Sequence, residues 1–108
     1  MHATSRPTRI TPQAAAQAAA DYLGLPTARL TTHNDAAHIF TADMHHLTAW
    51  YRALGGTVTR ERAGLGVTLW TLRTHTEPRN DGTHTPILIH CLALTTEDID
   101  PTLTNAAA

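Results

Sequence analysis

Alternating apolar and polar residues mark two long strand-like runs in the second half of the chain. Residues 66–76 and 86–94 are rich in β-branched and aromatic side chains, which favour strands. Residues 78–82, Pro-Arg-Asn-Asp-Gly, lie between them and are typical of a turn. We therefore predict an antiparallel hairpin whose loop is centred on Asn80.

The predicted hairpin has two different faces, because successive side chains of a strand point to opposite sides of the sheet. The expected register pairs Trp70 with Ile89, Leu72 with Ile87 and His75 with His84. One face is mainly apolar and is the expected core face. The other face is apolar at one end and basic or imidazole-bearing at the other, where it carries Arg73, His75, His84 and His90.

The first half of the chain predicts two helices and shorter strands. Thr11 and Pro12 are typical of a helix start, and the alanine-rich segment up to residue 23 favours a helix. Residues 44–54 carry apolar side chains at helical spacing behind Asp43, a candidate N-cap. Further strands are expected over residues 28–33, 36–42 and 57–62.

These elements predict an α+β fold with the order α-β-β-α-β-β-β. The economical arrangement is an antiparallel sheet of about five strands with two helices packed on one face. A chain of 108 residues forms one domain. We expect this domain over residues 11–103, with a flexible arm at residues 1–10 and a flexible tail at residues 104–108.

Two helices on one face leave the opposite sheet face uncovered. Apolar side chains at Val67, Leu69, Leu88 and Leu92 would then form a patch that a soluble monomer rarely exposes. We therefore expect a homodimer that buries this face against itself.

Composition excludes several classes of protein. The net charge is −1 with neutral histidines, so no strong field favours a nucleic-acid backbone. A single cysteine, Cys91, excludes an intrachain disulfide and a cysteine zinc cluster. No apolar run approaches the roughly 20 residues that span a bilayer, and no secretion signal is recognisable, so we expect a cytoplasmic protein without membrane contact. The absence of lysine suggests a high-GC bacterial genome.

Eight histidines make imidazole the main candidate for site chemistry. His75 and His84 could share a divalent metal with Glu77 or Asp81, or could form the ordinary exposed end of two strands. His90 and Arg73 would give an apolar cup a polar handle for an anionic ligand, whereas the plainer interpretation of His90 is a partly buried, hydrogen-bonded histidine. We assign candidate ligand binding to Arg73, His75, His84 and His90.

No nucleophile–base pair can be named from the sequence. Ser5 lies in the expected arm, and Cys91 lies on the expected core face. This pattern favours a protein that is not an enzyme and that holds no cofactor, the alternative being a bound divalent metal.

Residues 38–94 resemble a single βαβββ module of the vicinal oxygen chelate superfamily, the glyoxalase and bleomycin-resistance fold. The matching residues are His38 on a strand, Asp43 before the helix, Trp50, Tyr51 and Arg52 within it, and Leu54 and Gly55 at its end. The resemblance implies a metal ligand at His38. The family's usual glutamate ligand has no counterpart in residues 86–94, and its cup needs two modules, so the resemblance is best met by metal-free members that bind ligands.

The sequence thus favours a small non-catalytic binding or regulatory module that acts as a homodimer. A first alternative is a metal-assisted enzyme or ligand-binding protein of vicinal oxygen chelate type, with candidates His38, His75, His84, His90 and Glu77. A second alternative is a nucleic-acid or phage-type interaction protein that uses Arg6, Arg9, Arg60, Arg62 and Arg73. Aromatic residues make up only 5% of the chain and leave little for base stacking, so nucleic acid is the less favoured partner.

Overall fold

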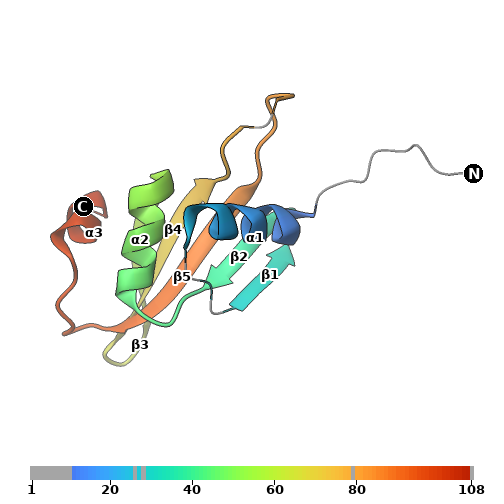
Figure 1. Ribbon diagram of the computed structural model, residues 1–108. Coiled ribbons are helices and arrows are strands. Elements are labelled where there is room, and N and C mark those ends of the chain that lie inside the picture. Colours follow the sequence, from blue (N-terminus) through green and yellow to red (C-terminus); the bar gives the residue numbers. More distant parts are fainter. Residues whose placement is uncertain (1–10, 26, 28, 79, 108) are drawn as a thin grey trace, which may run out of the picture.

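The computed structural model describes residues 11–25, 27, 29–78 and 80–107, so the arm expected at residues 1–10 lies outside the described residues. Its elements are α1 (Pro12–Leu23), β1 (Arg29–His33), β2 (Ala36–Phe40), α2 (Met44–Leu54), β3 (Thr57–Gly64), β4 (Val67–His75), β5 (Pro86–Leu94) and α3 (Pro101–Ala106). The strands form one sheet in the order β1-β2-β5-β4-β3, with α1 and α2 on the same side of it (Figure 1). The α+β class and the five-stranded sheet are therefore confirmed.

The sheet is mixed, and the expectation of a purely antiparallel sheet was wrong. β2 and β5 run parallel, with Ala37 beside Ile87 and Phe40 beside His90, whereas the other neighbouring strands are antiparallel. The physical reason is the helical crossover: α2 carries the chain over the sheet after β2, and strands joined by a helix run parallel. A tight turn after β3 and a ten-residue loop after β4 then return β5 to the position between β4 and β2.

The register of the long hairpin differs from the expected one by two residues. Trp70 pairs with Cys91 and Leu72 with Ile89, and His75 lies opposite Pro86 rather than His84. The pairing continues into the loop, where the N–H of Thr76 donates to the carbonyl of Thr85 at 2.9 Å. Because the shift is an even number of residues, every side chain stays on the face expected for it.

Local chemistry explains both long helices. The Thr11 hydroxyl accepts a hydrogen bond from the N–H of Ala14 at the start of α1, and the Asp43 carboxylate caps α2. Gly24 ends α1 in the left-handed region, with φ of 68°.

The third helix, α3, was not expected from the sequence. Asp100 caps its N-terminus, Pro101 opens it, and Leu103 is fully buried against the core. The ordered structure therefore runs through Ala106, beyond residue 103, where we expected the domain to end.

The core lies between the sheet and the helices. Leu47 and Trp50 of α2 are fully buried, and Ala16 and Ala20 let α1 pack closely on the sheet. The strands contribute alternate residues to this core, namely Ala37, Ile39, Val58, Trp70, Leu72, Ile87, Ile89, Cys91 and Ala93. No helix of the described residues is long and apolar enough to span a membrane.

Candidate functional site

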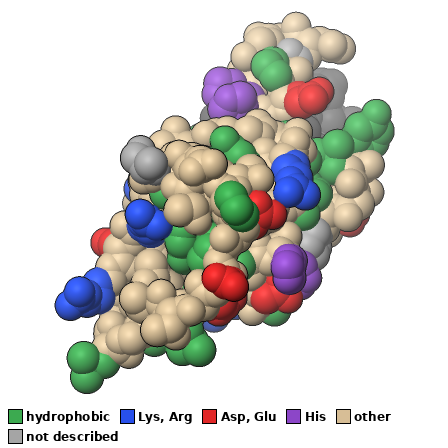
Figure 2. Space-filling view, turned by 90° about the vertical axis from the view of Figure 1, so that its left-hand side faces the viewer, with side chains coloured by type: hydrophobic (Ala, Val, Ile, Leu, Met, Phe, Trp, Pro, Cys, Tyr) green, Lys and Arg blue, Asp and Glu red, His purple; other side chains and the backbone are tan. Residues whose placement is uncertain are grey.

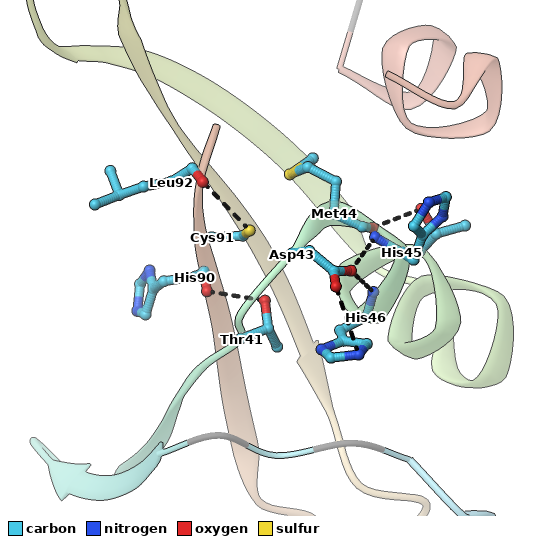
Figure 3. A network of polar contacts seen from close by, with 9 residues as sticks. Thr41, Asp43, Met44, His45, His46, His90, Cys91 and Leu92 are labelled. Atoms are coloured by element: carbon cyan, nitrogen blue, oxygen red, sulfur yellow. Dashed lines mark hydrogen bonds and ion pairs between the residues drawn. The ribbon is translucent and has the colours of Figure 1, made fainter. Parts of the chain in front are cut away.

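The sheet face opposite the helices, here called the open sheet face, carries the other set of alternating side chains. Figure 3 shows the alternation on β5, where His90 and Leu92 point to one side and Cys91 points to the other, toward α2. The apolar residues of the open sheet face are Phe40, Val67, Leu69, Leu88, Leu92 and Leu94. Leu92 and Leu94 are each 62% exposed and Phe40 is 42% exposed, so this face presents a large apolar area to solvent.

Three polar side chains on neighbouring strands form a hydrogen-bonded chain at the centre of the open sheet face. Nδ1 of His90 on β5 lies 3.1 Å from the hydroxyl oxygen of Thr71 on β4. Nε2 of the same ring lies 2.9 Å from Nδ1 of His38 on β2. We call this arrangement the Thr71–His90–His38 chain. It exists because β5 lies between β4 and β2, so that three strands bring their side chains together.

The two imidazoles of the chain are nearly coplanar. Their ring planes differ by 10°, and their centroids are 5.2 Å apart. The centroid distance exceeds the 2.9 Å N···N distance by about two ring radii, as expected for rings joined edge to edge by an in-plane hydrogen bond. This geometry aims the lone pair of one nitrogen at the proton of the other.

The hydrogen bonds of the chain are linked in direction, because a neutral imidazole has one donor nitrogen and one acceptor nitrogen. If the Thr71 hydroxyl donates to His90, then His90 donates to His38; if His38 donates to His90, then His90 donates to Thr71. Both ring nitrogens of His90 are used in either case. Nε2 of His38 ends the chain, and it has no hydrogen-bond partner among the described residues.

The surroundings of His90 favour its neutral form. Burial lowers the pKa of His90, and the neighbouring His38 and the Arg73 guanidinium lower it further. Phe40 lies against the same ring at a centroid distance of 5.1 Å, and Arg29 lies over Phe40. The charge of Arg73 and the apolar ring of Phe40 therefore both lie close to this imidazole.

A cavity of about 300 Å³ opens beside His90 on the open sheet face. Its walls are largely apolar and comprise Phe40, Thr41, Ala42, Leu69, His90, Cys91 and Leu92. Thr41 is held in place by hydrogen bonds from its N–H and its hydroxyl to the carbonyl oxygen of His90 (Figure 3). Volume and lining fit a compact apolar group, such as a small ligand or a side chain of another molecule.

The remaining residues predicted to bind a ligand lie farther along the hairpin. His75 and His84 do come together, with ring centroids 4.3 Å apart, even though they are not opposed in the sheet register. His75 is four residues beyond Thr71 on β4, about 13 Å along an extended strand. The predicted four-residue site is therefore divided: His90 belongs to the chain at the centre, and His75 and His84 form a separate exposed pair.

The described residues do not contain three histidine, cysteine or acidic side chains placed to hold one metal ion together. Among the described residues, His75 and His84 have no third histidine, cysteine or acidic side chain placed to complete a metal site. The facing nitrogens of His38 and His90 are already engaged in the hydrogen bond between these two rings. We therefore assign no metal centre to the part of the chain that the structure describes.

Cys91 offers little as a nucleophile. It is buried on the core face, and burial raises the pKa of its thiol. We therefore take the open sheet face, and not Cys91, as the candidate functional site.

Reasoning from the sequence missed Thr71 and Phe40 and reached His38 only through the family resemblance. The signal for Thr71 was present, since the period of two along β4 places it on the same face as Leu69 and Arg73. The signal for His38 beside His90 was absent, because it depends on the parallel pairing of β2 with β5.

Comparison with known proteins adds no assignment to this geometry. The chain matches no protein-family model, no curated protein and no solved structure.

Proposed function

We propose that this protein is a small non-catalytic binding or regulatory module that acts as a homodimer through its open sheet face. The observation that carries the proposal is the uncovered face itself: the helices of the described chain pack on one side of the sheet, and Phe40, Leu92 and Leu94 are exposed on the other. Exposed apolar side chains gathered on one face of a protein are typical of an interaction site.

The apolar side chains supply the driving force for association. Fully burying a leucine stabilises by roughly 1.5–3 kcal/mol, so the 62% exposed Leu92 and Leu94 would each contribute about 1–2 kcal/mol per protomer when covered. Phe40 and the partly buried Val67, Leu69 and Leu88 extend the same surface. A two-fold axis through this face would let two copies cover each other.

One edge of the sheet is less suited to association than its open face. β3 forms one edge and presents Arg60, Glu61 and Arg62 in succession, all of them exposed. Charged residues on an edge strand oppose pairing with another chain. This contrast supports stacking of two open sheet faces rather than extension of the sheet.

Size-exclusion chromatography with light scattering at micromolar concentration tests the proposal. We expect a dimer for the natural chain and a monomer for Leu92→Glu, because a carboxylate would be buried at the centre of the interface. Leu65→Glu is the matched control: Leu65 is fully exposed at the β3–β4 turn, outside the open sheet face, and its substitution should leave the dimer intact. A monomeric natural chain, or a dimer that persists in Leu92→Glu, would disprove the proposed interface.

A small metal-assisted enzyme or ligand-binding protein of vicinal oxygen chelate type is the second candidate. The element order β2-α2-β3-β4-β5 is the βαβββ order of the resemblance, and His38 lies on the open sheet face. A second copy would supply the second module that such a cup needs. Metal analysis of untagged protein separates the candidates, since stoichiometric metal with loss of stability in chelator would favour a metal-dependent member.

The arrangement of charge favours neither DNA nor RNA as a partner. Arg60 lies over the ring of Trp70 on the core side of the sheet, whereas Arg73 is on the open sheet face. On the side shown in Figure 2, basic and acidic side chains are interspersed. Phosphate backbones bind to continuous basic surfaces, and these arginines do not form one.

A further inference from the structure

Another cavity, of about 410 Å³, lies where β3 and β4 face the connection from β5 to α3. Figure 1 shows this connection and α3 on the side of α2 away from α1. The strand residues that line the cavity from β3 and β4 pair in register with core-side positions, so they do not belong to the open sheet face. The lining is mainly polar, and six of its side chains can contact a ligand through charge or hydrogen bonds: Arg60, Thr68, Trp70, Thr95, Glu97 and Asp98.

Arg60 and Trp70 supply hydrogen-bond donors to this cavity. The Arg60 guanidinium lies over the Trp70 ring, 5.4 Å from the ring centroid, and this cation–π contact leaves the N–H groups of the guanidinium able to donate. Trp70 is only 3% exposed, and its indole N–H has no hydrogen-bond partner among the described residues. Because buried N–H groups without a partner are uncommon in folded proteins, this donor calls for an acceptor from outside the chain. A carboxylate is the acceptor that matches both a guanidinium and an N–H group.

Glu97 and Asp98 supply negative charge to the same cavity. The backbone holds Glu97 in place, since its N–H donates to the carbonyl of Leu94 at 2.9 Å and its Oε1 accepts from the N–H of Leu94 at 3.4 Å. Asp98 has neither a hydrogen-bond nor an ion-pair partner in the part of the chain that the structure describes. Two neighbouring carboxylates attract a cationic group, such as an ammonium.

Two threonine hydroxyls add a further donor. The hydroxyl oxygens of Thr68 on β4 and Thr95 after β5 lie 3.0 Å apart. Their mutual hydrogen bond uses one of the two hydroxyl protons, so the other proton is available to a ligand in the cavity.

The charges of the cavity do not neutralise one another. Arg60 forms no ion pair with Glu97 or Asp98 in the described structure, although all three line one cavity. Opposite charges held apart in this way suit a ligand that carries both charges itself. We propose that this cavity binds a small organic zwitterion, whose carboxylate contacts Arg60 and the indole N–H of Trp70 and whose ammonium contacts Glu97 and Asp98. Free amino acids have this chemistry, and the proposal does not depend on the homodimer.

Nuclear magnetic resonance of the natural, nitrogen-labelled chain tests the proposal directly. The chain has two tryptophans, so its indole N–H signals come from Trp70 in the cavity and from the fully buried Trp50, which serves as an internal reference. The probes are the standard α-amino acids, together with γ-aminobutyrate and ε-aminocaproate, in which the two charges are farther apart. At millimolar concentration, at least one probe should shift the Trp70 signal to saturation and leave the Trp50 signal unchanged. If no probe moves the Trp70 signal, the proposal is wrong.

Derivatives of the bound probe test whether both charges are recognised. The N-acetyl derivative lacks the ammonium and the amide derivative lacks the carboxylate, so each loses one set of charge-assisted contacts. Each should bind about tenfold or more weakly than the zwitterion, because one such contact contributes about that much affinity. Equal binding of either derivative would show that the cavity recognises one charge alone and would overturn the zwitterion.

Two substitutions locate the site, and a third is their matched control. Arg60→Gln and Asp98→Asn each remove one charge from the cavity and should weaken binding by about tenfold or more. Arg62→Gln removes an equally exposed arginine two residues farther along β3 that does not line the cavity, and it should leave the affinity unchanged. The indole signals of each variant without ligand report whether its core is intact. Unchanged affinity in Arg60→Gln and Asp98→Asn, or an equal loss in Arg62→Gln, would refute the assigned site.

Discussion

Replacing Thr71 with valine exchanges one hydroxyl for a methyl group at the buried end of the Thr71–His90–His38 chain. Thr71 is 7% exposed, so water cannot readily take the place of the lost hydroxyl beside Nδ1 of His90. A buried polar group left without its partner costs about 1–3 kcal/mol, and the better burial of a methyl group recovers part of that cost. We therefore expect Thr71→Val to lower the free energy of unfolding by about 1–2 kcal/mol.

Urea unfolding followed by circular dichroism measures this change. With a slope of about 1–2 kcal/mol per molar urea, the midpoint should fall by roughly 1 M. The melting temperature should fall by about 4–8 °C for each kcal/mol. Both proteins are best compared in the Leu92→Glu background, so that a shift in association does not enter the free energy.

Thr59→Val is the matched control for this experiment. Thr59 lies on the same sheet face, directly across from Thr71 on the neighbouring strand, but it is exposed. Its substitution should change stability by less than about 0.5 kcal/mol. Equal effects of the two substitutions would show that the hydrogen bond between Thr71 and His90 contributes no stability.

Three further predictions concern pH, a helix cap and a close backbone approach. Because the pKa of His90 is lowered in the folded protein, the unfolded chain binds more protons than the folded one just below about pH 6.5. Urea midpoints should therefore fall as the pH drops from there toward the pKa of folded His90, and constant midpoints would contradict the lowered pKa. Asp43→Ala removes the acceptor for two N–H groups at the start of α2 and should cost about 0.5–2 kcal/mol in chemical unfolding, an unchanged midpoint being the contrary result. Gly56→Ala should lower the free energy of unfolding by more than about 2 kcal/mol, because φ is 119° and a Cβ would lie 2.3 Å from the carbonyl oxygen of Arg73. In the control Gly64→Ala, the added Cβ meets no atom within 4 Å, so equal stabilities of the two variants would refute the close backbone approach at Gly56.

Local pattern was sufficient for most elements of this fold. The predicted helix over residues 44–54 and the strand over residues 86–94 have the bounds seen in the structure. Capping residues and the 3.6-residue period act within one or two turns, and strand alternation acts between adjacent residues, so both can be recognised without tertiary contacts. The alternation also assigned the two faces of the hairpin correctly despite a register error of two residues, because the side-chain period of a strand is two.

The third helix shows where local pattern fails. Residues 101–106 are polar apart from Pro101, Leu103 and Ala106, and six residues are too few for a stable isolated helix. Burial of Leu103 against the core stabilises the segment, and that contact is formed only in the folded chain.

The pairing of β2 with β5 is the other decision of the tertiary structure, and the candidate site depends on it. His38 and His90 are 52 residues apart, and neither strand carries a signal that names the other as its neighbour. The α2 crossover and the two reversals that follow set β5 between β2 and β4, and with it the in-plane hydrogen bond between the two imidazoles and the contact to Thr71. Alternation along each strand determined which side chains share the open sheet face; the order of the strands determined which of them meet, because strand order is a property of the whole packed chain.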